Sequence, residues 1–296
     1  MVIVKLMGGL GNQMFQYAVA RRLAHVNKAP LKLDLSWFEN IPHGDTCRKY
    51  ELHVFECLQD VATPEEVKAL RGADIGKWPK VAKSFLKSIG LFTNPAYIKE
   101  KFFHFDPELL GLSGDIYLDG FWQSAKYFED VEEIIRADFT IRLAQDPLNN
   151  ELGDTIQSCE SVSIHVRRGD YINDEKTGCF HGITSMDYYN AAITEVTSRL
   201  HNPHFFVFSD DSSWAKSNLT VDVPMTCLTH NGPENGYEDL RLMSLCKHHI
   251  IANSSFSWWG AWLANNHTKM VFAPKRWFHN PGVNTDDLIP GNWIRL

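Results

Sequence analysis

The chain has 296 residues, 44% of them hydrophobic, which is enough to bury a large core in one large domain or in two lobes. Its formal charge of -7 at pH 7 argues against nucleic acid or an anionic membrane as a partner, because proteins that bind them usually carry a basic excess. The six cysteines form no Cys-x-x-Cys pair, so neither a zinc site nor a disulfide framework is indicated. No stretch approaches about twenty apolar residues, and we therefore expect no membrane span.

The N-terminal half predicts strands that alternate with helices. Its first strand is a β-branched apolar run that ends in a glycine turn, and Asn12 opens the helix that follows. Residues 75–113 contain prolines and aromatic residues that follow no regular spacing, so we predict a mixture of helix and loop there. In chain order we predict a strand over 2–7, a turn over 8–11, a helix over 13–27, a strand over 31–35, a capped helix over 63–70, a strand over 115–120 and a helix over 124–139.

The C-terminal half alternates more regularly and begins after a predicted linker at residues 146–150. Strands that alternate with helices imply a parallel, doubly wound sheet. We therefore expect an α/β protein with two Rossmann-like lobes that face a cleft, over residues 1–150 and 151–296. The predicted strands are 161–166, 204–210, 248–253 and 269–273, and the predicted helices are 184–200, 236–246 and 255–264.

The stretch SIHVRRGDY (163–171) carries the first candidate site. His165, Arg167, Arg168 and Asp170 fall where a predicted strand ends, and ligands of open α/β sheets bind at that edge. The planar, permanently charged guanidinium group suits bidentate binding of phosphate oxygens, so a pyrophosphate is the expected ligand. The alternative is an arginine–aspartate ion pair that fixes a loop.

A second candidate anion site lies at residues 253–263, NSSFSWWGAWL, where a strand gives way to a helix. Backbone amides at a helix N-terminus carry partial positive charge, and the hydroxyl groups of Ser255 and Ser257 can add donors toward a phosphate. Ordinary serine capping is the alternative. We expect at least two of the three tryptophans, Trp258, Trp259 and Trp262, to be core residues.

Two further segments are candidates for ligand contact. The loop GGLGNQ fails as a dinucleotide fingerprint because Met14 stands where the third glycine belongs, but Asn12 could donate to a phosphate or sugar oxygen, or cap the helix. In FSDD (208–211), Asp210 or Asp211 could accept from a nucleobase or cap the next helix. No Asp-x-Asp pair occurs, so arginines would replace a metal ion at a nucleotide sugar.

Three blocks together resemble the α1,2-fucosyltransferases of glycosyltransferase family 11. They are GGLGNQMFQYA (8–18), HVRRGDY (165–171) and YEDLRLMSLCKHHIIANSSFSWWGAWL (237–263). The segments DGFWQSAKYF (119–128) and VFAPKRWF (271–278) are similar as well, so the resemblance runs over nearly the whole chain. It implies a GT-B arrangement with an N-terminal acceptor lobe and a C-terminal donor lobe. GDP-fucose is the implied donor, a galactoside-terminated oligosaccharide the implied acceptor, and no cofactor or metal is required.

The same resemblance implies roles for individual residues. Arg167 would grip the diphosphate, with Arg168 orienting the loop and His165 on the nucleoside side. Ser255 and Ser257 would meet the phosphates, Asp210 would face guanine, and Asn12 would reach the diphosphate or fucose. Because the glycine block begins at residue 8, we expect a soluble, cytoplasmic bacterial-type enzyme, peripheral to the membrane if its acceptor is lipid-linked.

The implied reaction is transfer of L-fucose to the 2-hydroxyl of a terminal β-galactoside with inversion. Cations around the diphosphate would stabilise the charge that develops on departing GDP, and Arg167 is the first candidate. Asp170 and Glu175 are candidate general bases, although either could be an ion-pair partner instead. The rival interpretations are another GDP-sugar or hydroxyl acceptor and, in a different class, a non-catalytic carbohydrate-binding protein.

Overall fold

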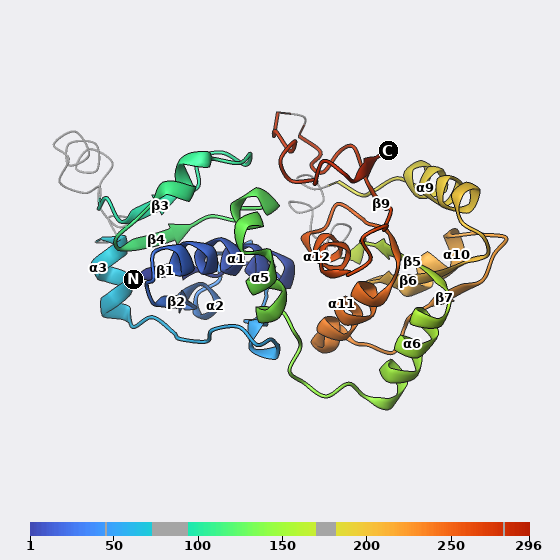
Figure 1. The fold of residues 1–296 in the computed structure, drawn as a ribbon, viewed down its shortest axis with the longest axis horizontal. Helices are drawn as coiled ribbons and strands as arrows, with labels where there is room; N and C mark the ends of the chain where they lie inside the picture. The colour runs from blue at the N-terminus through green and yellow to red at the C-terminus, as the bar shows by residue number, and fades with distance from the viewer. Residues whose placement is uncertain (45, 73–93, 170–181, 281) are drawn as a thin grey trace. The chain divides into compact units, whose positions relative to one another are not determined.

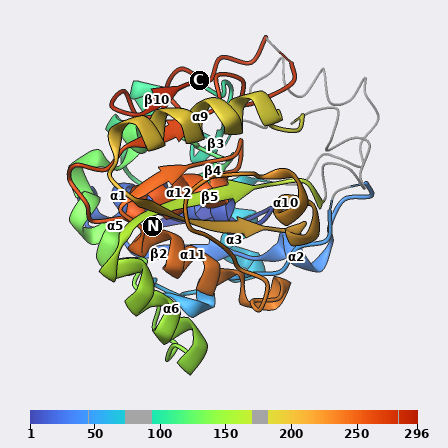
Figure 2. The same ribbon diagram turned by 90° about the vertical axis from the view of Figure 1, so that its right-hand side faces the viewer.

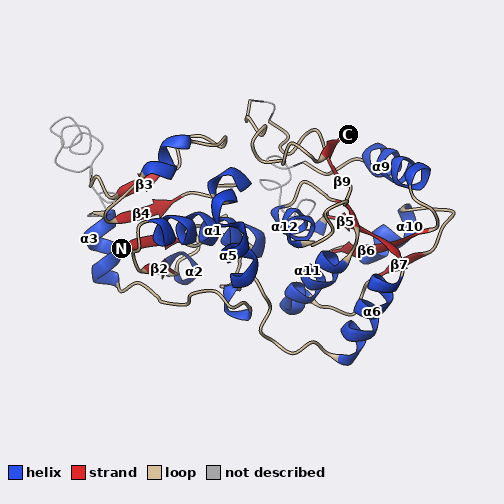
Figure 3. Ribbon diagram, viewed as in Figure 1, coloured by secondary structure: helices blue, strands red, loops and turns tan. Residues whose placement is uncertain are grey.

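The computed structural model describes residues 1–44, 46–72, 94–169, 182–280 and 282–296. The chain divides into two compact units, Met1–Thr140 and Ile141–Leu296. Each unit is built around one parallel β-sheet with helices packed against it (Figures 1 and 3). The predicted α/β class with two Rossmann-like lobes is confirmed.

The sheet of the first unit has the strand order β2-β1-β4-β3, and every pair is parallel. Strand β1 lies between two neighbours, and its valines and isoleucine are fully buried, as expected for an inner parallel strand. The strands are β1 (Val2–Lys5), β2 (Leu31–Asp34), β3 (Tyr97–Lys99) and β4 (Ile116–Asp119), and the helices are α1 (Leu10–Val26), α2 (Ser36–Glu39), α3 (Pro64–Arg71) and α5 (Glu132–Asp138), with 3-10 turns at Leu52–Val54, Pro107–Gly111, Ala125–Tyr127 and Glu129–Val131.

Two expectations for the first unit are wrong in detail. The helix predicted over 124–139 is interrupted: two short 3-10 turns precede α5, because Ser124 caps the first turn and the backbone of buried Phe128 leaves the helical region. Strand β3 lies within the region predicted as helix and loop. It has three residues, too few for an alternating pattern to show.

The sheet of the second unit has the order β10-β9-β8-β5-β6-β7, again with every pair parallel. Its four predicted strands and three predicted helices are all present, with ends that differ by a few residues. The strands are β5 (Glu160–Val166), β6 (Pro203–Ser209), β7 (Met225–Cys227), β8 (His248–Ile250), β9 (Val271–Ala273) and β10 (Ile294–Arg295), and the helices are α6 (Pro147–Ser158), α9 (Met186–Arg199), α10 (Ser212–Asn218), α11 (Gly236–Leu245) and α12 (Ser255–Leu263), with a 3-10 turn at Pro233–Asn235.

Helices cover both faces of this second sheet. Val162, Ile164 and Val166 of β5 pack in one buried cluster with residues of α9. Phe206 and Phe208 of β6 point to the other face, where they pack with residues of α6 and α11. Figure 2 shows α9 and α11 on opposite sides of the strands. The sheet is therefore doubly wound, as the alternation predicted.

The predicted linker at 146–150 instead starts helix α6. The Asp146 carboxylate caps this helix by accepting from the backbone N–H groups of Leu148 and Asn149, and Pro147 occupies the first turn. An aspartate followed by proline is a helix-start signal as well as a loop signal, which explains the error. Within the described residues, no helix is both long and apolar enough to cross a membrane.

Candidate active site

Three loops of the second unit emerge together at the carboxyl edge of its sheet. Strand β5 lies between β6 and β8, with Val166 beside Ser209 and Ile164 beside Ile250. The segments that follow these strands contain the arginine motif, Asp210 and the start of α12. Ligands of open parallel sheets bind at this edge, so the candidate residues from three separate stretches of sequence share one site.

Asp210 braces the loop that carries the two arginines. Its carboxylate accepts from the backbone N–H of Arg168 at 2.8 Å and of Gly169 at 3.0 Å. The same carboxylate pairs with the Arg167 guanidinium at 3.1 Å, and about a fifth of either side chain is exposed. The ion-pair alternative is thus present in the structure. Because Arg167 directly follows β5, this ion pair lies at the carboxyl edge of the sheet.

Arg168 lies flat over an indole ring. Its guanidinium carbon is 3.7 Å from the ring centroid of Trp214 in α10, an arrangement that favours the cation. Its Nε atom is 3.7 Å from the Asp211 carboxylate, which also caps α10 by accepting from the Trp214 N–H at 3.1 Å. The sequence pointed to Arg168 but not to Trp214. These contacts hold Arg168 in place and suit the loop-orienting role that the resemblance implied.

His165 is buried and neutral. Burial, and secondarily the Arg167 guanidinium, lower the pKa of His165 to about 3. The Tyr189 hydroxyl donates to its backbone carbonyl at 3.0 Å, and its ring packs 5.6 Å from that of Phe256 in the first turn of α12. A neutral imidazole can accept or donate a hydrogen bond but adds no charge, so the positive charge at this edge comes from the arginines.

The segment that leads into α12 is fixed by Asn253. The Asn253 amide donates to the carbonyl oxygens of Gly182 and Trp277, both at 3.1 Å, and accepts from the Thr184 hydroxyl at 2.9 Å. Ser255 is the first residue of α12 and is partly buried. Ser257 is buried, and its hydroxyl donates to the Ser254 carbonyl at 3.2 Å.

The tryptophans of α12 are core residues, as predicted. Trp258 and Trp259 are fully buried, and Trp262 is 8% exposed. The Trp258 indole N–H donates to the Leu288 carbonyl at 2.8 Å, so its one polar group is satisfied. Their role is to hold α12 against the sheet.

In the first unit, the glycine turn places Asn12 in the first turn of helix α1. Gly9 caps this helix, which begins at Leu10, so the capping role considered for Asn12 is wrong. Gly8 has a φ of +77°, a left-handed conformation that favours glycine. The Asn12 amide oxygen accepts from the Gln123 side chain at 2.7 Å. This contact fixes which end of the amide faces Gln123.

Two buried glutamines that the sequence analysis passed over organise the same turn. Gln13 donates to the carbonyl oxygens of Gly8 at 2.9 Å and Lys49 at 2.8 Å, and accepts from the Glu51 N–H at 2.9 Å. Gln16 accepts from the Met7 N–H at 2.9 Å. The signal that could have revealed them is a pair of amides three residues apart among the apolar residues of the first half of α1.

The structure also shows a half-buried carboxyl group with a raised pKa that the sequence pattern did not point to. Asp239, in the first turn of α11, accepts from the Asn231 amide at 2.9 Å. Burial raises the pKa of Asp239 to about 6. Asn231 lies in the segment after β7, on the same edge of the sheet as the arginine loop, which makes Asp239 a further candidate for the site.

Two predicted site residues, Asp170 and Glu175, lie outside the described residues, so their roles stay predictions. Across the described ranges, no three His, Cys, Asp or Glu side chains come together in a group that could hold a metal ion.

Comparison with known proteins identifies the family. The model of glycosyl transferase family 11 matches residues 89–296. An α-1,2-colitosyltransferase of Escherichia coli is 35% identical over all of this chain and 98% of its own length. The chain belongs to glycosyl transferase family 11. It is therefore a glycosyltransferase, as the three sequence blocks indicated.

The chain is also similar to more distant relatives and to solved structures. A galactoside α-(1,2)-fucosyltransferase 1 of Leontocebus fuscicollis is 27% identical over 51% of this chain and 44% of its own length. The crystal structure of NodZ α-1,6-fucosyltransferase with GDP superposes with a TM-score of 0.50 at 13% identity, covering 88% of this chain and 91% of NodZ. At that identity the likeness shows the fold alone, and it agrees with the expected GT-B-like class.

Proposed function

We propose that this glycosyltransferase moves L-fucose from GDP-β-L-fucose to the 2-hydroxyl of a terminal β-galactoside, with inversion and without a metal ion. The observation that carries the proposal is the pair of arginines held at the carboxyl edge of the second sheet by Asp210 and Trp214. Fixed guanidinium groups there suit a nucleotide diphosphate. The names of the family relatives support the α1,2 linkage and the galactoside acceptor.

Within this proposal, Arg167 binds the diphosphate and stabilises the negative charge that grows on it as the sugar leaves. Ser255 and the first amides of α12 add donors to the phosphates, with Ser257 beneath them. His165 contributes a neutral ring on the nucleoside side, and Asn12 donates to the diphosphate or sugar.

We propose that Asp210 contacts guanine. It also makes two hydrogen bonds and one ion pair to the loop that carries the arginines, and these contacts hold that loop in place. The loop that carries Arg167 is thereby held before any ligand arrives. Preorganised charge of this kind stabilises a transition state without reorganisation at the moment of reaction. Asp170 and Glu175 remain the proposed general bases for the acceptor hydroxyl.

The full-length similarity to a colitosyltransferase favours one alternative donor. Colitose is L-fucose without the 3-hydroxyl group, so the two GDP-sugars differ at one position. A site that hydrogen-bonds the 3-hydroxyl rejects the deoxy sugar strongly, by about 10⁴-fold, because a buried polar group is left unpaired. A site without that bond accepts both donors.

The test is to incubate the purified protein with GDP-fucose or GDP-colitose and a panel of β-galactosides, with excess chelator present. We expect an α1,2-linked product with full activity in chelator, identified by linkage analysis. No transfer from either donor would refute the proposal, as would a different linkage. Loss of activity in chelator would show that a metal ion is required.

The role of Arg167 is tested by Arg167→Ala, with Arg199→Ala on the exposed face of α9 as the control. We expect the first variant to lose about 10²–10³-fold or more in turnover, the usual effect of removing a charge-stabilising donor. Its melting temperature should not change, because Arg167 lies at a strand end. Activity within about tenfold of wild type would contradict the role.

A further inference from the structure

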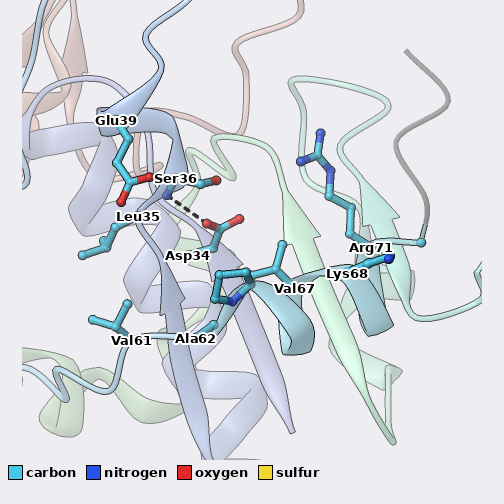
Figure 4. A pocket seen from close by; sticks show the side chains of 11 residues that line it. Asp34, Leu35, Ser36, Glu39, Val61, Ala62, Val67, Lys68 and Arg71 are labelled. Atoms are coloured by element: carbon cyan, nitrogen blue, oxygen red, sulfur yellow. Dashed lines mark hydrogen bonds between the residues drawn. The ribbon is translucent and has the colours of Figure 1, made fainter. Parts of the chain in front are cut away.

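The first unit contains a pocket that no candidate residue above occupies. It has a volume of about 630 Å³ and lies between the end of β2, helix α2, the segment at residues 61–62 and helix α3 (Figure 4). This volume falls within the range of about 300–1,000 Å³ that small-molecule sites occupy. The pocket is large enough for an oligosaccharide unit.

Asp34 is fixed in the wall of this pocket and is 2% exposed. One oxygen of its carboxylate accepts from the Ser36 N–H at 2.9 Å, and the other accepts from the Tyr117 hydroxyl. Burial and the Asp34 carboxylate raise the pKa of Tyr117 far above its usual range, so the hydroxyl keeps its proton and donates. Asp34 is therefore held by neutral donors and forms a fixed part of the pocket wall.

The charged groups around the pocket balance one another. Asp34 and Glu39 supply carboxylates, while Lys68 and Arg71 of α3 supply cations. An anionic ligand would meet two carboxylates, and a cationic ligand would meet two cations, so neither is favoured. A neutral ligand with many hydroxyl groups can donate to the first pair and accept from the second.

Apolar side chains form much of the remaining surface. Leu35, Val61, Pro64 and Val67 line the pocket, and Val61 is 52% exposed. A sugar ring presents C–H groups on its faces and hydroxyls around its rim, so it matches apolar surface between polar groups. With its balanced charges and apolar surface, the lining fits a neutral carbohydrate better than a nucleotide or a charged peptide.

The pocket lies at the carboxyl edge of its own sheet. Asp34 is the last residue of β2 and pairs with Lys5, the last residue of β1. The Leu6 N–H donates to the Asp34 carbonyl at 3.0 Å, so the chain passes directly from this pairing to the glycine turn at Gly8. The pocket and the turn that carries Asn12 both lie at the carboxyl ends of neighbouring parallel strands, where ligands bind.

We infer that this pocket binds the acceptor glycan, with the Glu39 carboxylate and the Ser36 hydroxyl contacting sugar hydroxyls and Val61 packing against a ring face. The inference deepens the proposed function and rests on it for the identity of the acceptor. It names a site of neutral carbohydrate recognition in the first unit, separate from the arginine loop of the second.

The test compares Glu39→Gln and Val61→Trp with two matched controls. Both positions are exposed, so the variants should fold, and Trp at 61 should fill the pocket. Glu129→Gln removes an exposed carboxylate elsewhere, and Val26→Trp enlarges a valine that is 50% exposed at the end of α1. Three quantities are measured: the KM for lactose, the rate of GDP-fucose hydrolysis without acceptor, and lactose binding by saturation-transfer NMR without donor.

We expect about a tenfold rise in the lactose KM for Glu39→Gln, the usual cost of one hydrogen bond to a charged group, and a larger rise for Val61→Trp, which fills the pocket, with hydrolysis unchanged in both. The controls should match wild type. An unchanged KM in both pocket variants would overturn the inference, as would hydrolysis that falls in parallel with transfer.

The NMR measurement separates this inference from the proposed function. If wild type does not use GDP-fucose, the proposed function fails, but lactose binding still decides about the pocket. Binding that is lost in Val61→Trp and kept in Val26→Trp supports the site. Binding that both variants retain, or that wild type lacks, refutes it.

Discussion

At the scale of single residues, the contact between Gln123 and Asn12 sets the orientation of the Asn12 amide, on which the proposed donation from Asn12 to the ligand depends. The Gln123 amide donates to the Asn12 oxygen, so the Asn12 NH₂ group points away from Gln123. An NH₂ group attracts a phosphate or sugar oxygen, whereas a carbonyl oxygen repels an anion. Gln123 is thus a positioning residue for Asn12.

Gln123→Glu tests this orientation. A carboxylate cannot donate, so the Asn12 amide should turn to donate to it and present its oxygen to the ligand instead. We expect the KM for the donor to rise about tenfold or more, while Gln123→Met, which has no polar preference, changes it less. Kinetics of wild type and both variants measure this, with Gln157→Glu on the exposed face of α6 as the control.

The double variant makes the test specific. With Asn12→Ala in place, Gln123→Glu should cost nothing further, because the two residues act through one group. Additive losses would show that Gln123 acts by another route.

The sequence could predict Arg167 but not the Gln123 contact, for a physical reason. Arg167 directly follows an apolar strand, and the end of a parallel strand is a place where ligands bind. Gln123 and Asn12 are 111 residues apart, and no local pattern records that they meet. Asp210 was predictable only in part. The sequence predicted its position at a strand end, but its hydrogen bonds to the arginine loop depend on how β5 and β6 pair in the sheet.

At the scale of elements, the approach of α11 and α12 depends on one glycine. A Cβ atom at Gly260 would lie 2.9 Å from the Met243 Cβ and 3.0 Å from its sulfur. Real Cβ atoms do not come that close, so α12 would have to move. Since α12 starts at the candidate site, this contact sets where its first turn lies.

We expect Gly260→Ala to lower the free energy of unfolding by about 1–3 kcal/mol, the usual cost of overpacking a core. Gly236→Ala is the matched control, because a Cβ there meets nothing within 4 Å and its backbone is already helical. Urea denaturation of both variants measures the difference. Equal stability of the two would show that the helices can separate without cost.

Elements were predictable where a clear apolar pattern marks them in the sequence. Strand β5 is a run of seven residues with six fully packed in the interior, and it was found from sequence. Strands β7 and β10 have three and two residues, and only their pairing with β6 and β9 identifies them as strands. Tertiary pairing, which a local pattern does not encode, makes them strands.

At the scale of the whole molecule, buried histidines link stability to pH. Burial lowers the pKa of His165 to about 3, and it also lowers the pKa of fully buried His249. An unfolded histidine has a pKa of about 6.5, so between that pH and about 3 the unfolded chain binds protons that the folded chain does not. Stability is therefore full above pH 6.5 and falls as the pH is lowered.

For His165 we expect a loss of about 2 kcal/mol between pH 7.5 and pH 5, from about 1.4 kcal/mol for each pH unit below 6.5. Urea denaturation at the two pH values should show this in wild type and a smaller loss in His165→Asn. His201→Asn, at an exposed position, should behave as wild type. An identical pH dependence in His165→Asn and wild type would mean that His165 is not buried neutral.

The division between Thr140 and Ile141 has an evolutionary consequence. Each half of the polypeptide has a complete sheet and its own hydrophobic interior, so a change in the loops of one half need not disturb the packing of the other. Selection can then diversify what each half recognises independently. Chimeras joined at this boundary would show whether the two halves carry separate specificities.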